Sequence, residues 1–136
     1  MDSQDPLVAF YATMTQETFK LGPGQNIVFD HALTNFGNAY HAFHGIFTAP
    51  YKGLYMFSGT IGSGHRDNLI SINYVLNGSI VARTRGHDYD MGGHTMLLVL
   101  NKGDDFSLQS QGNMGTSSIL GNAYSSFTGR LVALLE

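Results

Sequence analysis

The sequence of 136 residues contains no cysteine and no tryptophan, and only three prolines. Without cysteine the chain can form neither a disulfide nor a thiolate metal site, and a thiol nucleophile is excluded. Because a domain of this length can be stable without disulfides, their absence does not identify a cellular compartment. The length suits a single domain with one enclosed core.

Charge is also scarce, since Asp, Glu, Lys and Arg make up 12% of the residues, about half the usual share. The net charge of −3 creates no field that would attract nucleic acid or an anionic membrane, so we expect neither partner. Low charge leaves room for apolar surface patches that a partner subunit could cover. The longest apolar runs, such as residues 96–100, are far too short to span a bilayer.

The first six residues are polar and acidic, without the cationic segment and apolar run of a signal peptide. We predict that residues 1–6 are a disordered extension, or one added during expression, and that residues 7–136 form one globular domain. No internal repeat, low-complexity tract or Gly-X-Y run interrupts this domain.

The residue pattern favours strands throughout. Seventeen glycines are scattered along the chain, and no long stretch carries the apolar period of a helix. Short β-rich runs recur between turn residues instead, as is typical of a sandwich or barrel. Strands are predicted over residues 7–13, 25–30, 39–43, 46–48, 54–61, 69–76, 79–85, 95–100, 106–110 and 123–135, with longer loops at 62–67, 86–93 and 111–121.

Two local patterns support the strand prediction most strongly. Residues 54–61 place Tyr55, Phe57 and Ile61 on one face, as expected for a strand with one buried side. Asn77-Gly78 follows the next alternating run, and both residues tolerate the positive φ of a type I′ hairpin turn. The same residues begin an Asn-Gly-Ser glycosylation sequon, but the turn preference alone accounts for them.

The sequence contains no motif typical of an enzyme. There is no Gly-x-Ser-x-Gly elbow, no phosphate-binding loop and no His-Glu-x-x-His. None of the six histidines stands in a recognisable nucleophile setting. We therefore expect a binding protein and not an enzyme.

Seven residues stand at the spacings of the signature of the C1q domain family: Phe29, Asn35, Tyr40, Phe47, Gly53, Tyr55 and Phe57. Further marks at both ends extend the resemblance from about residue 7 to residue 133. Two positions depart from the family pattern. Gly59 replaces an aromatic residue, and Ser107 stands where many members carry tryptophan. We expect altered packing near Ser107, not loss of the fold.

The resemblance implies an all-β, ten-stranded jelly-roll sandwich of the C1q and tumour-necrosis-factor type, secreted and usually a homotrimer. Several short segments, such as residues 34–40, most resemble the short C1q-domain proteins of bivalve molluscs. The resemblance therefore implies a soluble pattern-recognition module of innate immunity that binds microbial polysaccharide or lipopolysaccharide in a lectin-like way. The alternative is a trimeric signalling or assembly ligand for a protein receptor, similar to tumour necrosis factor or cerebellin.

The predicted loop over residues 86–93 carries the candidate metal ligands. Asp88 and Asp90 are two residues apart in a Gly-rich segment, and paired carboxylates can present oxygens to a hard cation. Asp90 also precedes Asp104 by fourteen residues, which resembles the position of a calcium-bearing Asp in some family members. Calcium is therefore the predicted cofactor, and a solvated polar loop with Asx-type turns is the alternative.

The candidate ligand-binding residues are cationic or aromatic: Arg83, Arg85, His65, Arg66, His87 and Tyr89. Arg83 and Arg85 share one strand face because they are two residues apart. His65 and Arg66 lie in a different loop. If the fold brings them to the arginines, the patch would suit phosphate or carboxylate groups of microbial glycans. The alternative is an ordinary solvated face.

Overall fold

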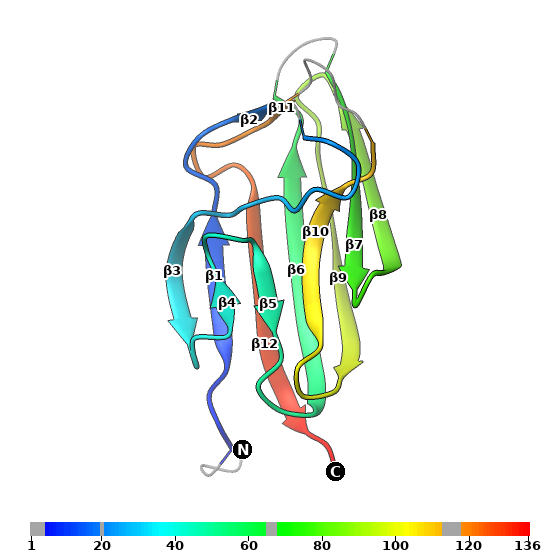
Figure 1. Ribbon diagram of the computed structural model, residues 1–136. Helices are drawn as coiled ribbons and strands as arrows, with labels where there is room; N and C mark the ends of the chain where they lie inside the picture. The colour runs from blue at the N-terminus through cyan, green and yellow to red at the C-terminus, as the bar shows by residue number, and fades with distance from the viewer. Residues whose placement is uncertain (1–4, 20, 65–67, 113–117) are drawn as a thin grey trace.

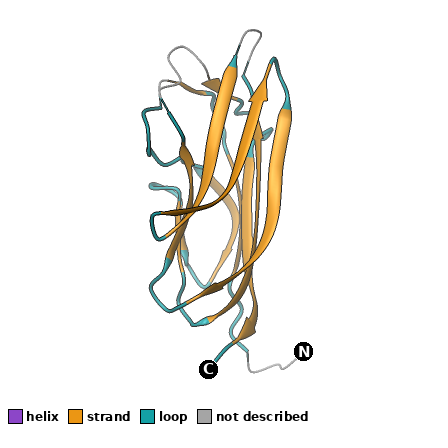
Figure 2. Cartoon of the chain, turned by 90° about the vertical axis from the view of Figure 1, so that its right-hand side faces the viewer, coloured by secondary structure: helices purple, strands orange, loops and turns teal. Residues whose placement is uncertain are grey.

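The computed structural model describes residues 5–19, 21–64, 68–112 and 118–136. All regular secondary structure in these residues is β-strand, and the strands form a two-layered sandwich (Figures 1 and 2). In this part of the chain, no helix is long and apolar enough to cross a membrane. The predicted all-β sandwich is confirmed.

Each main layer is a sheet of five antiparallel strands. Sheet I has the order β3 (His31–Phe36), β1 (Ala9–Thr13), β12 (Ser126–Leu134), β6 (Gly53–Gly62) and β9 (Met91–Leu100). Sheet II has the order β4 (Tyr40–His41), β5 (Ile46–Thr48), β10 (Asp105–Ser110), β7 (Leu69–Leu76) and β8 (Ser79–His87). A two-stranded sheet pairs β11 (Ser118–Ile119) with β2 (Thr18–Phe19) at one end of the sandwich (Figure 1).

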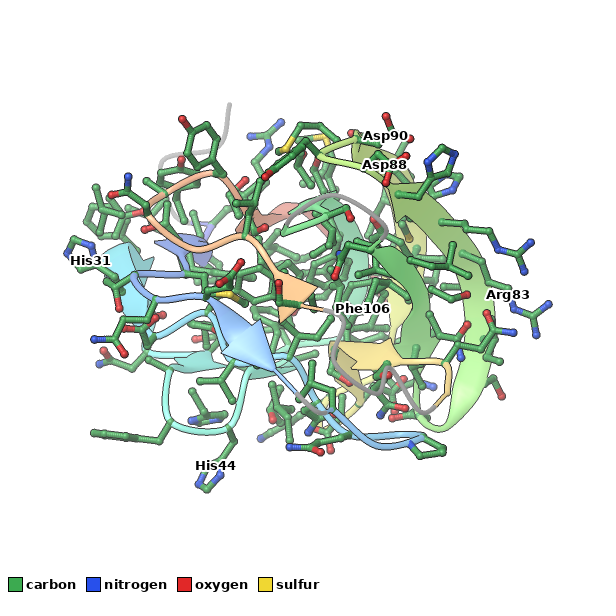
Figure 3. All side chains as sticks on the ribbon, turned by 90° about the horizontal axis from the view of Figure 1, so that it is seen from above. His31, His44, Arg83, Asp88, Asp90 and Phe106 are labelled. Atoms are coloured by element: carbon green, nitrogen blue, oxygen red, sulfur yellow. The ribbon has the colours of Figure 1, made fainter. Side chains whose placement is uncertain are left out.

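Aromatic side chains fill the space between the two sheets. Phe57 of sheet I stacks on Phe106 of sheet II with ring centroids 4.1 Å apart, and Figure 3 shows Phe106 in the interior. Phe10 of sheet I stacks on Tyr40 of sheet II at 4.6 Å. Because burial of each large side chain contributes roughly 1.5–3 kcal/mol, these contacts hold the two layers together.

The core packing explains Gly59, which stands where the family signature has an aromatic residue. At Gly59 a Cβ atom would lie 2.6 Å from Leu108 Cδ2 and 2.9 Å from Tyr74 Cε2. The Tyr74 hydroxyl, which comes from sheet II, donates a hydrogen bond to the Gly59 carbonyl at 2.8 Å. The Tyr74 ring therefore occupies space that an aromatic residue at position 59 would need.

The alternating strand and the hairpin turn are confirmed. Tyr55, Phe57 and Ile61 are fully buried on one face of β6. Asn77 and Gly78 join β7 to β8 with φ angles of 48° and 80°, the left-handed region that a type I′ turn requires.

The predicted strand over residues 25–30 is wrong. The segment forms only an isolated bridge, Asn26 to Gln109, which is framed by backbone hydrogen bonds from Ile27 N–H to the Leu108 carbonyl at 2.8 Å and from Ser110 N–H to the Gln25 carbonyl at 3.0 Å. The regular strand in this region is β3, for which no strand was predicted. β3 is an edge strand that pairs only with β1, and most of its side chains are exposed. Without a buried face, it has no apolar alternation for sequence reasoning to detect.

The long polar loop predicted over residues 86–93 is also wrong. β8 continues to His87 and β9 begins at Met91, so the connection is a tight turn. A Cβ atom at Gly93 would lie 2.4 Å from the Gly59 carbonyl oxygen, and one at Gly92 would lie 2.8 Å from Thr84 Cγ2. These glycines permit close approach within strands, whereas the sequence pattern suggested a flexible loop.

Candidate ligand-binding face

The outward face of sheet II carries the predicted arginines. Along β8, Arg83, Arg85 and His87 are exposed while Thr84 and Gly86 between them are buried. The three exposed residues therefore share one face, as the two-residue period predicts. β8 is the edge strand of sheet II, and Figure 3 shows Arg83 extending away from the sandwich.

A hollow of about 300 Å³ lies beside these side chains. We call it the arginine hollow, and its lining residues are Ser71, Arg83, Thr84, Arg85 and Gln111. Arg83 Nε donates to Asn73 Oδ1 of the neighbouring strand β7 at 3.3 Å. A guanidinium has five N–H donors, so this bond leaves most of them for a ligand. Across the described residues, ion pairs involve only His87 with its neighbours Asp88 and Asp90, so neither arginine is neutralised by a carboxylate there.

The turn after β8 gathers the two predicted carboxylates. Asp90 N–H donates to the His87 carbonyl at 2.9 Å, and Asp88 and Tyr89 have φ angles of 49° and 69°. His87 Nδ1 lies 3.4 Å from Asp88 Oδ2, and its Nε2 lies 3.9 Å from Asp90 Oδ2. Figure 3 shows Asp88 and Asp90 side by side.

The structure thus brings six of the eight predicted site residues onto one strand and its turn: Arg83, Arg85, His87, Asp88, Tyr89 and Asp90. Tyr89 is exposed at the tip of the turn. His65 and Arg66 lie outside the described residues, so their contribution to this face stays a prediction.

The turn alone does not meet the coordination that calcium requires. Calcium takes roughly six to eight oxygen ligands. The turn offers two carboxylates that lie beside the same imidazole, and Asp90 Oδ2 also accepts the His87 backbone N–H at 3.4 Å. Within the ranges that the structure describes, no group of three or more His, Cys, Asp or Glu residues could hold a metal ion. The predicted calcium binding by Asp88 and Asp90 is therefore not confirmed.

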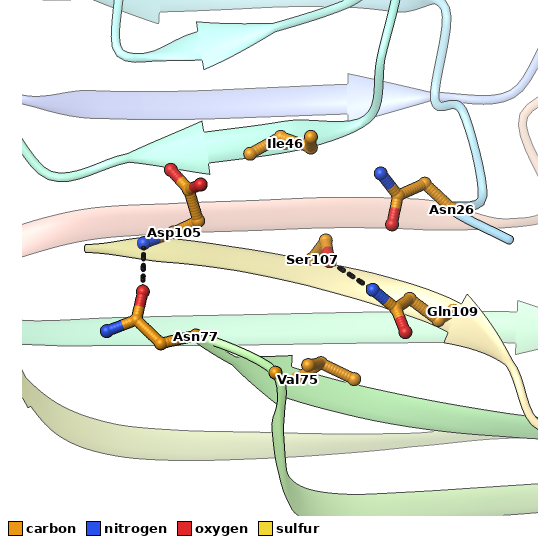
Figure 4. A pocket seen from close by; sticks show the side chains of 8 residues that line it. Asn26, Ile46, Val75, Asn77, Asp105, Ser107 and Gln109 are labelled. Carbon is orange, nitrogen blue, oxygen red and sulfur yellow. Dashed lines mark hydrogen bonds between the residues drawn. The ribbon is translucent and has the colours of Figure 1, made fainter. Parts of the chain in front are cut away.

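Sequence reasoning missed a second hollow on the same outward face, named here the Ser107 hollow. It has a volume of about 230 Å³ and is lined by Asn26, Ile46, Val75, Asn77, Gly78, Asp105, Ser107 and Gln109 (Figure 4). Ser107 lies in this hollow, and the altered packing expected near it stays a prediction. The one sequence signal was the small residue at a position where tryptophan is common in the family.

Sheet I presents a different chemistry on its outward face. One row of paired residues crosses all five strands in the order Phe36, Ala9, Arg130, Met56 and Leu97. The neighbouring pair Leu54 and Val99 continues the apolar surface. Leu97 and Val99 are 60% and 55% exposed, which is costly for leucine and valine unless another surface covers them.

The sandwich and its two outward faces define a domain of the C1q type. The chain matches the family model described as "C1q domain" over residues 9–132, and it belongs to the C1q domain family. A protein of Mytilus edulis, described as "Heavy metal-binding protein HIP", is 29% identical over 126 residues. That match covers 90% of this chain but 59% of the relative, so the chain spans about three fifths of the relative's length.

Solved structures show the same fold. The globular domain of zebrafish complement 1qA matches with a TM-score of 0.77 and 16% identity, covering 94% of this chain and 99% of that chain. Murine APRIL matches with a TM-score of 0.73 and 11% identity, over 93% of this chain and 99% of the other. Eiger TNF of S. frugiperda matches with a TM-score of 0.70 and 13% identity, over 97% and 96% of the two chains. The predicted jelly roll, the family and the likeness to a bivalve protein are confirmed.

Proposed function

We propose that this protein is a secreted, non-enzymatic recognition module that binds acidic microbial polysaccharide or lipopolysaccharide as a homotrimer. The observation that carries the proposal is the pair of exposed arginines, Arg83 and Arg85, beside a hollow on a sheet edge. No carboxylate of the described residues forms an ion pair with either of them. Their guanidinium groups are therefore available to an external anion.

The chemistry of guanidinium selects the ligand class. Arginine offers a planar fork of donors that matches the paired oxygens of phosphate and carboxylate groups. Such groups are abundant on acidic bacterial polysaccharides and on the lipid A and core regions of lipopolysaccharide. Since both arginines are exposed and screened by water, each single site is expected to be weak and sensitive to salt.

A trimer would compensate for weak single sites. Three copies of one site raise the apparent affinity for a repeating ligand by about 10² or more when their spacing fits the repeat. The exposed apolar side chains of Leu97 and Val99 on sheet I support self-association through the face opposite Arg83 and Arg85. In this arrangement sheet I is covered and sheet II stays open to the ligand.

The proposal does not require a metal. The Mytilus relative is described as heavy metal-binding, but the described part of the present chain gathers no cluster of three potential metal ligands. Recognition is assigned to Arg83 and Arg85, and no step depends on calcium at Asp88 and Asp90.

Binding to immobilised lipopolysaccharide tests the proposal. The double variant Arg83→Ala/Arg85→Ala is expected to bind roughly tenfold to a hundredfold more weakly, because charge-assisted hydrogen bonds are lost at each site. Lys52→Ala/Lys102→Ala is the matched control, since it removes the same charge from exposed turns elsewhere. Equal binding by the arginine variant and the wild type, or an equal loss in the lysine control, would contradict the proposal. A wild type that binds a cell-surface protein but no polysaccharide would favour the receptor-ligand alternative.

A further inference from the structure

We infer that the Ser107 hollow is a second binding subsite, which holds one uncharged pyranose ring of a saccharide. It lies on the outward face of sheet II, the face that also carries Arg83 and Arg85. The inference rests on the shape of the hollow, on its apolar walls and on an unpartnered buried acceptor. Its extension to a saccharide that also contacts the arginines rests on the proposed function.

Strand register explains why a hollow forms at this place. Ser107 on β10 pairs with Ile46 of β5 on one side and with Val75 of β7 on the other. Figure 4 shows Ile46 and Val75 flanking β10, with the small Ser107 side chain between them. A small residue between two larger neighbours leaves a depression in the sheet surface.

The walls of the hollow suit the apolar side of a sugar ring. Ile46 is partly buried and Val75 is 4% exposed, and both line the hollow. A pyranose presents C–H groups on its faces and hydroxyl groups around its rim. Ligand sites of this kind combine apolar walls with a few placed polar groups.

One acceptor among the residues that line the hollow lacks a hydrogen-bond donor, whereas Asn77 Oδ1 accepts the Asp105 N–H at 2.8 Å and Ser107 Oγ accepts from Gln109 Nε2 at 3.4 Å (Figure 4). Asn26 Oδ1 is buried and has no hydrogen-bond partner among the described residues. Leaving a buried acceptor unsatisfied costs free energy, which a donor from a ligand would recover. A hydroxyl group supplies such a donor.

The remaining side chains explain why an uncharged ligand is favoured over an ion. Asp105 is the single carboxylate lining the hollow, and its Oδ1 accepts the Thr48 hydroxyl at 2.7 Å. This negative charge disfavours an anion, and no second carboxylate of the lining would help to hold a cation. The amide groups of Asn26 and Gln109 both donate and accept hydrogen bonds, which suits the hydroxyl groups of a sugar, since these also do both.

The two hollows are close enough for one saccharide to reach both. Gln109 lines the Ser107 hollow and pairs with Asn73, which pairs with Arg83 and accepts its Nε–H. β10 and β8 are two strand spacings apart, roughly 10 Å. The ligand class of the face is therefore a saccharide with an uncharged pyranose beside an acidic group.

Protein-observed NMR titration tests the subsite directly. The probes are the methyl glycosides of glucose, galactose, mannose and N-acetylglucosamine, with acyclic sorbitol as a control for hydroxyl groups without a ring. At least one glycoside is expected to bind with a Kd on the order of 1 mM and to shift the amide signals of Val75 and Ser107. Sorbitol is expected to bind at least tenfold more weakly. Absence of binding for all four glycosides, shifts located elsewhere, or equal binding of sorbitol would overturn the inference.

Two variants strengthen the test. Ser107→Trp fills the hollow with the residue that the family resemblance expects there, and Asn26→Leu removes the unpartnered acceptor with little change of size. Each is expected to weaken glycoside binding at least tenfold while the folded NMR spectrum is retained. Unchanged glycoside binding in a folded Ser107→Trp variant would overturn the inference. If that variant does not fold, unchanged binding in Asn26→Leu overturns it.

The arginine variant separates this inference from the proposed function. Arg83→Ala/Arg85→Ala is expected to keep neutral glycoside binding within twofold, although it loses binding to lipopolysaccharide. If lipopolysaccharide binding survives in this variant and glycosides still bind at Ser107, the proposed function fails and the subsite stands. If glycosides do not bind the wild type, the subsite fails whatever the arginine variant does.

Discussion

The outward faces of the two sheets differ in their most exposed side chains although both follow the same two-residue period. On sheet I the outward residues include Met56, Leu97 and Val99, whereas on sheet II they include Asn73, Arg83 and Ser107. The inward residues of both sheets are alike, since each contributes buried aromatic rings to one core. The comparison indicates that the shared core specifies the fold, and the proposed function assigns assembly to sheet I and recognition to sheet II.

The largest expected effect comes from charging the apolar face of sheet I. Leu97→Glu/Val99→Glu places two carboxylates where the proposed trimer contact would bury them, at a cost of several kcal/mol each. The apparent association constant is expected to fall by three or more orders of magnitude. Light scattering at micromolar concentration should return one subunit mass in place of three.

A matched change on sheet II controls this prediction. Ile80 and Val81 on β8 are 46% and 40% exposed, and Ile80→Glu/Val81→Glu adds the same charge. This variant should remain trimeric. A monomeric wild type, or a sheet I variant that stays trimeric, would show that sheet I is not the assembly face.

The next effect concerns the hairpin that borders the Ser107 hollow. Gly78 has a φ of +80°, and a Cβ there would meet no atom within 4 Å, so Gly78→Val isolates the backbone penalty. We expect a loss of roughly 1–3 kcal/mol in the free energy of unfolding, measured by urea denaturation. Gly112→Val is the control, because Gly112 is equally open but has no left-handed φ. Equal losses in the two variants would refute the backbone explanation.

A smaller effect is expected from the buried tyrosines, which distinguish the core from both outward faces. Burial raises the pKa of the Tyr40 phenol, whose hydroxyl donates to the Phe29 carbonyl at 2.7 Å. Because the folded pKa lies above the unfolded value of about 10, this stabilising contribution is complete below pH 10 and is lost as the pH rises further.

Urea midpoints measured from about pH 9 to about pH 11.5 span the ordinary tyrosine pKa of about 10. Over this range the midpoint should fall more steeply with pH in the wild type than in Tyr40→Phe. Tyr40→Phe is expected to be less stable at neutral pH, since the hydroxyl bond is lost. Parallel curves for the two proteins would mean that ionisation of Tyr40 is not coupled to unfolding.

The smallest expected effect is that of chelation. Two carboxylates at a tight turn, both beside His87, are too few for a closed calcium site. Polysaccharide binding is therefore expected to stay within twofold when EDTA is added or Asp90 is replaced by alanine. If both treatments weaken binding, and their combination adds little, the carboxylates hold a functional ion after all.

Much of the fold was predictable because local signals agreed with burial. The alternation of Tyr55 and Phe57, and the Asn77-Gly78 turn, directly reflect a buried strand face and a positive φ. β3 was not predictable, since an exposed edge strand carries no apolar period. Gly93 suggested a loop because its close neighbour, the Gly59 carbonyl, belongs to β6, which is adjacent in the sheet but far away in the sequence.

The candidate site was predictable only in part, for the same physical reason. The spacing of Arg83 and Arg85 places them on one face without knowledge of the fold. The Ser107 hollow depends on neighbours from β5, β7 and the segment around Asn26, which only the folded sheet brings together. An unpartnered acceptor such as Asn26 Oδ1 has no signature in the sequence.

The central claim, that the two faces divide assembly and recognition, is tested most directly by measuring subunit number and saccharide binding on the same samples. Arg83→Ala/Arg85→Ala is predicted to remain trimeric and to lose binding both to immobilised lipopolysaccharide and to a short soluble acidic oligosaccharide. Leu97→Glu/Val99→Glu is predicted to be monomeric and to bind the immobilised ligand about 10²-fold more weakly, with unchanged affinity for the short oligosaccharide. A trimer lost in the arginine variant, or short-oligosaccharide binding lost in the sheet I variant, would contradict the division of the two faces.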